Sequence, residues 1–271
     1  MEIKDYTSAN REAWNEVMPK HQAFAKEKLD ELFSQSGYII QNNVELLKIF
    51  KDLPIVGKDL IHLCCNNGSE LLSIKNMGAN RCVGIDICDE AIAEAKNRAK
   101  LCGIECEFVC SDVFEMPKEY NSSFDIVHIT SGCLGWIPNV EIFFKLCNKL
   151  LRNTGYIVIH EIHPFSETLP FDDYKTDNRL QIVEPYFRTE PIVENDSLDY
   201  LGKTNYDAKT HYWFVHTMSS IVKSLNQNGF IINEFIESPQ DISAGHAKLE
   251  ELDAKIPLSM IIVGKKIEQH L

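Results

Sequence analysis

Two short segments carry residues that could bind a ligand at the ends of neighbouring strands. The first is the apolar run Leu60–Leu63, which leads into a turn of small and polar residues, Cys64-Cys65-Asn66-Asn67-Gly68. The second is the apolar run Val83–Ile85, which ends on the carboxylate of Asp86. In a βαβ unit such a turn lets the backbone approach a ligand, and an acid about twenty residues later accepts hydrogen bonds from a ribose diol. The spacing therefore predicts a site for an adenosine-containing ligand.

Two later strand ends carry polar residues of the same kind. Ser111-Asp112-Val113 follows the expected strand at 106–110, and Thr130-Ser131-Gly132 follows the run Phe124–Ile129. The carboxyl ends of parallel strands meet at one edge of a sheet, and ligands of open α/β sheets lie beyond that edge. We expect both segments to face the same ligand as Asp86.

A fifth apolar run ends on His160-Glu161-Ile162-His163. An imidazole at a strand end can act as a general base, and a neighbouring carboxylate can orient it. His163 is therefore a candidate catalytic base, with Glu161 as its partner. The aromatic segment around Tyr212 and Trp213 could line a substrate pocket.

Each of these residues also has an ordinary structural interpretation. The turn at 64–68 could be a plain strand–helix loop, Asp86 a helix cap and Asp112 a turn acid. His163 could be a hydrogen-bonded core histidine, and Trp136 a packing residue.

The elements that position these residues alternate regularly. Strands are expected at 60–63, 82–85, 106–110, 124–129 and 156–160, with helices at 69–77, 89–100 and 140–151 between them. Further strands are expected at 211–215, 230–235 and 256–263, and a helix follows Thr217. This alternation predicts an α/β fold with a mostly parallel sheet covered by helices on both faces.

The chain divides into an N-terminal helical segment, 1–50, and a larger domain, 51–271. Pro19 is expected to interrupt the first helical pattern. An insertion at about 162–210 contains four prolines and many aromatic residues but no long helical pattern, which predicts an ordered cap.

The composition excludes several classes of protein. The formal net charge is −13, and no basic run is present, which argues against a nucleic-acid partner. No apolar stretch is long enough to span a bilayer. Nine cysteines, an odd number that falls partly in expected strands, indicate reduced thiols and a cytoplasmic protein. The spacing of Cys102, Cys106 and Cys110 matches no metal-binding motif, so no metal is predicted.

The order of these motifs resembles a class I S-adenosylmethionine-dependent methyltransferase of the small-molecule type. The family consensus for the turn is Asp-Leu-Gly-Cys-Gly-x-Gly. Here His62 replaces the acid, Cys64 and Asn66 replace two glycines, and Gly68 is retained. Asparagine tolerates left-handed backbone best among the other residues, so the turn can keep its shape. The resemblance implies a Rossmann-like fold with a seven-stranded sheet whose last strand is antiparallel.

The resemblance also implies a role for each motif toward S-adenosylmethionine and its product S-adenosylhomocysteine. The turn would hold the amino-acid part, Asp86 the ribose, Asp112 and Val113 the adenine, and the segment after the fourth strand would lie beside the sulfonium. The implied cofactor-binding residues are Cys64, Cys65, Asn66, Gly68, Asp86, Ile87, Ser111, Asp112, Val113, Thr130, Ser131 and Gly132, with Trp14 and His21 from the N-terminal segment. The implied substrate pocket contains Trp136, His163, Tyr212 and Trp213.

The implied reaction moves a methyl group to an oxygen or nitrogen atom, less readily to carbon, of a small molecule by in-line displacement. Two alternatives stay open. A nicotinamide-dependent oxidoreductase would share the strand–turn–helix–strand–acid layout but expects Gly-x-Gly-x-x-Gly, whereas this turn has one glycine. A protein that binds S-adenosylmethionine without catalysis is the other.

Overall fold

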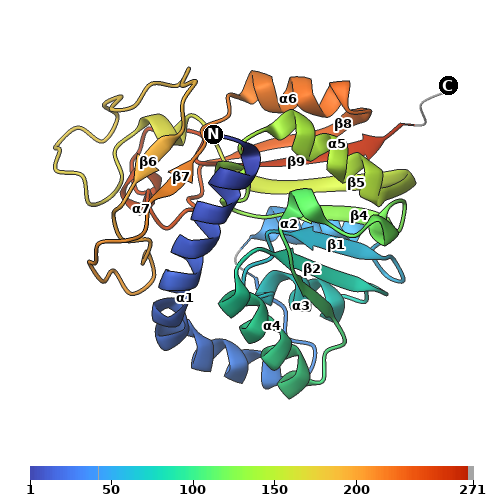
Figure 1. Ribbon diagram of the computed structural model, residues 1–271. Helices are drawn as coiled ribbons and strands as arrows, with labels where there is room; N and C mark the ends of the chain where they lie inside the picture. The colour runs from blue at the N-terminus through green and yellow to red at the C-terminus, as the bar shows by residue number, and fades with distance from the viewer. Residues whose placement is uncertain (42, 268–271) are drawn as a thin grey trace.

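A seven-stranded sheet forms the centre of the computed structural model, which describes residues 1–41 and 43–267. The strand order is β3-β2-β1-β4-β5-β9-β8 (Figure 1). The first five strands in this order are parallel, and β9 runs antiparallel to both of its neighbours. The fold class predicted from the sequence is confirmed. The bounds of the strands are β1 Leu60–Leu63, β2 Cys82–Asp86, β3 Glu107–Cys110, β4 Phe124–Ile129, β5 Leu151–Ile162, β8 Phe230–Ser238 and β9 Ser259–Lys266.

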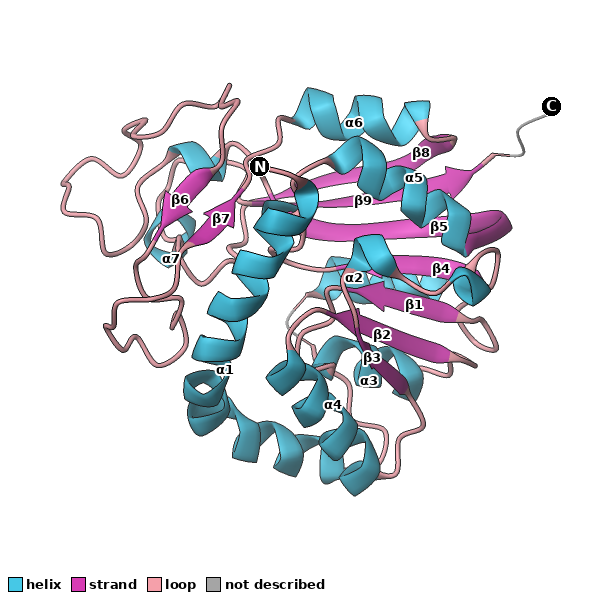
Figure 2. Cartoon of the chain, in the orientation of Figure 1, coloured by secondary structure: helices cyan, strands magenta, loops and turns pink. Residues whose placement is uncertain are grey.

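Helices cover both faces of this sheet (Figures 1 and 2). One face packs against α5 (Val140–Leu150) and α6 (Met218–Gln227), and the other against α2 (Val44–Asp52), α3 (Ser69–Asn76) and α4 (Asp89–Cys102). The central strands are mostly apolar because both of their faces are buried; all four residues of β1, including His62, are buried. The apolar layers between the sheet and its helices therefore hold the carboxyl ends of the strands, where the candidate site residues lie, in fixed positions.

The N-terminal helix α1 (Ile3–Ser34) continues through Pro19, so the predicted interruption is wrong. Proline removes one backbone donor and kinks a helix without ending it when packing holds both sides. Figure 1 shows α1 changing direction part of the way along its length. Its buried face, which includes Ala13, Val17 and Met18, packs toward α4 and β7.

The segment at 162–210 is mostly irregular, as its sequence predicts. It contains a 3₁₀ turn at Ser166–Thr168 and the short strand β6 (Ile192–Glu194). That strand pairs antiparallel with β7 (His211–Trp213) in a separate two-stranded sheet. A small helix, α7 (Ala247–Glu250), lies nearby, and its Leu249 packs with Leu169 and Leu258.

The ends of several elements differ from the expected ones. β5 begins at Leu151 instead of 156, because Leu151 already pairs with Phe124 across an irregular register. The expected domain ends at residue 271, and its last four residues lie outside the described ones. Across the described chain, no helix is both long and apolar enough to cross a bilayer.

Candidate functional site

The turn between β1 and α3 has the backbone shape of a glycine-rich loop although it holds one glycine. Cys64, Asn66 and Gly68 have φ values of 55°, 48° and 74°. Left-handed backbone costs an ordinary residue about 1–2 kcal/mol, and asparagine tolerates it better than most. Gly68 is also required by packing, because a Cβ atom there would lie 2.5 Å from a ring carbon of Phe108. The turn therefore keeps the shape that the sequence predicts.

Asp86 joins this turn to the end of β2. Its Oδ2 accepts the Asn66 N–H at 2.7 Å, and its Oδ1 accepts the Cys88 N–H at 2.9 Å. Burial raises the pKa of Asp86, and these backbone donors oppose the rise. Each oxygen keeps a second lone pair, so the carboxylate can still accept hydrogen bonds from a diol. Ile87 follows it and is partly buried.

Asp112 lies beside Asp86 at the end of β3. The Ser111 N–H donates to the Asp86 carbonyl at 2.9 Å, which fixes the two strand ends together. Asp112 Oδ1 accepts the Phe114 N–H at 2.9 Å and caps the 3₁₀ turn Val113–Glu115. The turn-acid interpretation is thus correct for one oxygen, and the other accepts no hydrogen bond from the described residues.

The loop after β4 is held by the carboxylate of Glu161. Its Oε1 accepts the N–H groups of Gly132 at 2.5 Å and Ile162 at 2.8 Å, and its Oε2 accepts the Leu134 N–H at 2.9 Å. Glu161 is 3% exposed. Burial raises its pKa to about 7, against the lowering effect of the three donors. Glu161 therefore shapes the segment that contains Thr130, Ser131 and Gly132.

The structure does not pair Glu161 with His163. His163 Nε2 lies 3.2 Å from Glu237 Oε1, on β8, and its Nδ1 accepts the Phe165 N–H at 3.1 Å. Both ring nitrogens are engaged, and burial lowers the pKa of the imidazole. The expected orienting role of Glu161 is therefore corrected: Glu237 takes it. His163 lines a hollow with Phe165, Thr168, Ile182, Tyr186 and Pro257.

A different cavity contains Glu161 and a carboxylate that the sequence analysis missed, Glu167. The Trp213 indole Nε1–H donates to Glu167 Oε2 at 2.8 Å. Burial raises the pKa of Glu167 to about 7. The one sequence signal was a single acid in the short segment between Pro164 and Pro170. The cavity is lined by Leu134, Gly135, Glu161, Ile162, Pro164, Glu167, Trp213, Phe214, Val215, His216 and Ile221.

Trp136 connects this cavity to α1. Its ring lies 4.9 Å from that of Trp213 and 5.4 Å from that of Trp14, both edge to face. His21 lies about two turns further along α1, where its Nε2 is 3.6 Å from a buried carboxylate oxygen of Asp199. The structure thus gathers Trp14, Trp136 and Trp213 into one aromatic group.

Tyr212 points away from that group. Its backbone N–H and carbonyl are both bonded to the Asn10 side chain, at 2.8 and 3.0 Å. Its ring packs edge to face on Tyr6. Tyr212 therefore fastens β7 to α1 and does not line the cavity, unlike Trp213.

Three buried histidines lie behind the turn, on the sheet face that packs against α2. His62 Nε2 contacts the Thr130 hydroxyl at 2.8 Å, and the His62 ring lies 4.8 Å from that of His128. His160 Nε2 lies 3.1 Å from the amide nitrogen of Asn43, the N-cap of α2. Burial lowers the pKa of His62 to about 3 and that of His160 to about 4, and it lowers the pKa of His128 well below its usual value. All three are neutral at pH 7.

Replacing His160 by glutamine is expected to reduce the acid sensitivity of the fold. An unfolded histidine takes up a proton near pH 6.5, whereas the folded-state pKa of His160 is about 4. Its stability contribution is complete above about pH 6.5 and is lost as the pH falls toward 4. Between pH 7 and 5.5 the loss is about 1 kcal/mol. The glutamine variant can still accept the Asn43 amide hydrogen. Urea unfolding at both pH values should show that its free energy of unfolding falls by about 1 kcal/mol less than that of wild type. Equal losses in both proteins would contradict this assignment.

No group of three or more histidine, cysteine, aspartate or glutamate side chains is placed to hold a metal ion among residues 1–41 and 43–267. All nine cysteines are free thiols. Cys102, Cys106 and Cys110 are each partly buried, and burial is the largest cause of the raised pKa of Cys102 and of Cys110.

Comparisons with known proteins agree with this geometry. Residues 61–159 match a family model described as a methyltransferase domain. A carboxy-S-adenosyl-L-methionine synthase of Campylobacter concisus is 27% identical over 170 residues, which cover 60% of this chain and 68% of that protein. A ubiquinone biosynthesis O-methyltransferase of Shewanella pealeana is 25% identical over 109 residues, or 40% of this chain and 45% of that protein.

Solved structures show the same fold. An S-adenosylmethionine-dependent methyltransferase of Mesorhizobium loti superposes with a TM-score of 0.60 at 18% identity, covering 83% of this chain and 99% of that one. Another from Clostridium acetobutylicum gives a TM-score of 0.58 at 14% identity, covering 82% and 89%. At these identities the likeness establishes the architecture.

Proposed function

We propose that this methyltransferase, which has the class I fold and takes its methyl group from S-adenosylmethionine, methylates an oxygen or nitrogen atom of a small molecule. The observation that carries the proposal is the left-handed turn at 64–68, bonded through the Asn66 N–H to the Asp86 carboxylate. That pairing puts close backbone approach and a diol acceptor side by side at one sheet edge.

The residues present fit the methyl donor. The turn offers a backbone cradle for the amino-acid part, Asp86 has free lone pairs for the ribose, and Asp112 has a second oxygen for the adenine amino group. In this proposal the N-terminal segment covers the site, because α1 brings Trp14 against Trp136. The proposed binding set is Cys64, Cys65, Asn66, Gly68, Asp86, Ile87, Ser111, Asp112, Val113, Thr130, Ser131, Gly132, Trp14 and His21.

When bound, S-adenosylmethionine supplies a methyl group on a positively charged sulfur. The chain must then position the acceptor in line and receive any proton that its nucleophile loses. Glu167 suits both tasks. Trp213 fixes Glu167 Oε2, whereas Oε1 has no hydrogen-bond partner among the described residues. A carboxylate whose pKa is about 7 can accept an O–H or N–H proton near neutral pH.

Glu167 therefore replaces His163 as the proposed base, and Glu161 is no longer proposed as an orienting partner. His163 has both nitrogens engaged, and Glu161 is committed to backbone donors. The proposed place for the reacting group of the acceptor is the cavity beside Trp213, with Trp136 behind it; its volume of about 30 Å³ has room for that group alone. Tyr212 and His163 lie outside this cavity.

Charge and thiol chemistry support the rest of the proposal. A net charge of −13 disfavours nucleic acid as the acceptor and leaves a small molecule as the better substrate class. Free thiols throughout are consistent with a cytoplasmic location. The Shewanella relative is an O-methyltransferase by name, which supports oxygen among the candidate nucleophiles.

Titration calorimetry with S-adenosylhomocysteine and with NAD⁺ tests the cofactor. We expect micromolar binding of the former and no measurable heat with the latter, because the turn lacks the three-glycine pattern of dinucleotide sites. Binding of NAD⁺ alone would favour the oxidoreductase alternative. Turnover of labelled S-adenosylmethionine with a panel of phenols, carboxylates and amines then separates an enzyme from a protein that only binds it.

A further inference from the structure

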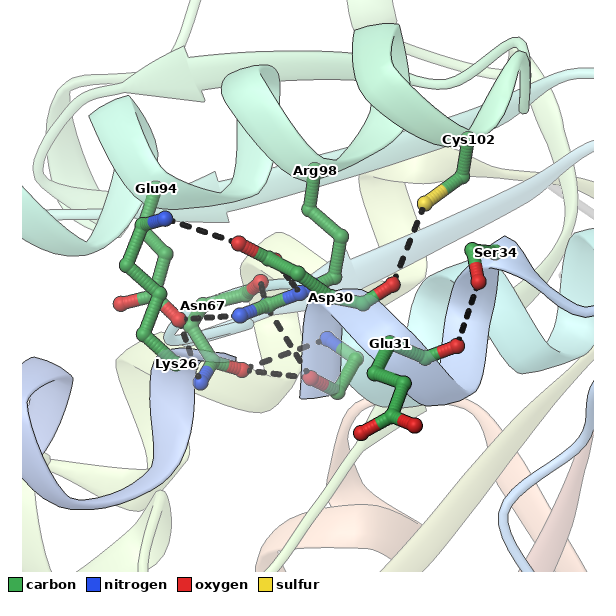
Figure 3. A network of polar contacts seen from close by, with 9 residues as sticks. Lys26, Asp30, Glu31, Ser34, Asn67, Glu94, Arg98 and Cys102 are labelled. Carbon is green, nitrogen blue, oxygen red and sulfur yellow. Dashed lines mark hydrogen bonds and ion pairs between the residues drawn. The ribbon is translucent and has the colours of Figure 1, made fainter. Parts of the chain in front are cut away.

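A buried arginine stands directly behind the proposed cofactor turn. Arg98 projects from α4, and its side chain is fully shielded from solvent. Its Nη1 donates to the Asn67 carbonyl at 3.0 Å, and its Nε donates to Asp30 Oδ1 at 2.8 Å. Its Nη2 donates to Glu94 on the same helix. Figure 3 shows these contacts converging from the turn, α1 and α4.

The other members of the network act on the same turn. The Asn67 amide donates to Glu94 Oε1 at 3.3 Å, and Asn67 Oδ1 accepts the Ser69 hydroxyl at 2.8 Å. Lys26 pairs with Asp30 at 2.8 Å from the neighbouring turn of α1. The Asn67 side chain is therefore held at both of its polar atoms while Arg98 holds its carbonyl.

Asn67 is the residue whose orientation matters most for the turn. It lies between Asn66 and Gly68, which both have left-handed backbone. Its carbonyl faces Arg98, and on the other side of that peptide the Gly68 N–H donates to the Cys65 carbonyl at 2.9 Å. Backbone in sparsely populated regions persists only where the surroundings over-determine it. Replacement of two consensus glycines by Cys64 and Asn66 increases that requirement.

We infer that Arg98 is a positioning residue for the methyl donor: it holds the Asn67 carbonyl so that the turn at 64–68 keeps its ligand-binding shape. This inference rests on the proposed function of that turn. Arg98 contacts no ligand itself and acts through the backbone of Asn67. Because Asp30 belongs to α1, the same guanidinium also links the helix proposed to cover the site with the turn beneath it.

The test compares the affinity for S-adenosylhomocysteine with stability in matched variants. Arg98→Met removes the contact to Asn67 but leaves Glu94 as an uncompensated buried charge, which can unfold the protein. The double variant Glu94→Gln with Arg98→Met removes both charges and avoids that problem. Arg152→Met is the control, because Arg152 also pairs with two carboxylates, those of Asp59 and Asp125, at the opposite edge of the sheet.

We expect the double variant to bind S-adenosylhomocysteine at least tenfold more weakly than wild type, and Arg152→Met to bind it within twofold. Amide hydrogen exchange should be faster at Gly68 and unchanged at Gly103, which lies at the far end of α4. A folded double variant with wild-type affinity and unchanged exchange at Gly68 overturns the inference. If the wild-type protein binds no S-adenosylhomocysteine, the proposed function is wrong instead. Amide exchange at Gly68 in the double variant still tests whether Arg98 holds the turn.

Discussion

Replacing Glu161 by alanine is expected to destabilise the fold strongly. Three backbone N–H groups, those of Gly132, Leu134 and Ile162, would lose their acceptor in a buried setting. A buried unsatisfied donor costs about 1–3 kcal/mol, so the expected loss is about 3 kcal/mol or more. The melting temperature should fall by about 6–12 °C, measured by calorimetry.

Glu161→Gln is the matched control for this experiment. Its single carbonyl oxygen can still accept two of the three N–H groups, so its melting temperature should lie between those of alanine and wild type. The affinity for S-adenosylhomocysteine should fall in the alanine variant as well, because the loop after β4 loses its anchor. An alanine variant as stable as wild type would show that water replaces the carboxylate without cost.

Replacing Asp86 by alanine is expected to weaken binding of S-adenosylhomocysteine by about tenfold to a hundredfold. Charge-assisted hydrogen bonds to a ribose diol contribute about 1.5–3 kcal/mol, and each 1.4 kcal/mol is a factor of ten. Titration calorimetry gives the dissociation constants directly.

The alanine variant also removes the acceptor for the Asn66 and Cys88 N–H groups, so it needs a control for the shape of the turn. Asp86→Asn keeps one acceptor oxygen of nearly the same position but removes the charge. We expect an intermediate affinity, and a stability in urea unfolding between those of the alanine variant and wild type, because the amide NH2 group cannot accept the second backbone N–H. Unchanged affinity in both variants would remove Asp86 from the ribose site.

Local sequence patterns predicted most of the fold correctly. At Leu60–Leu63 all four positions are buried and three of the four residues are apolar, as expected for a strand covered on both faces. Thr217 caps α6, where the sequence predicts a helix to begin. The exception, Pro19, shows the limit of propensity: tertiary packing against α4 keeps α1 continuous through a residue that would end an isolated helix.

The candidate site was predictable where strand order alone brings residues together. Asp86, Asp112 and Thr130 each end a strand of one parallel sheet, so the topology places them at the same edge. The left-handed backbone of Asn66 could also be predicted, because the ability of asparagine to adopt that conformation is a property of the residue itself.

Partners of buried polar side chains could not be predicted in this way. His163 pairs with Glu237 because β5 and β8 flank β9 and end at the same edge of the sheet. Glu167 contacts Trp213 through a segment without periodic pattern. Glu161 and Arg98 both contact backbone groups of loops, which no side-chain pattern encodes.

By itself, the sequence determined which segments become strands and helices and which acids stand at strand ends, since these follow from residues a few positions apart. Only the tertiary structure decided which carboxylate holds a loop, which faces the cavity and which pairs with an imidazole. A buried polar atom takes the nearest available partner in space, and that partner comes from whichever distant segment the packing of the sheet brings beside it.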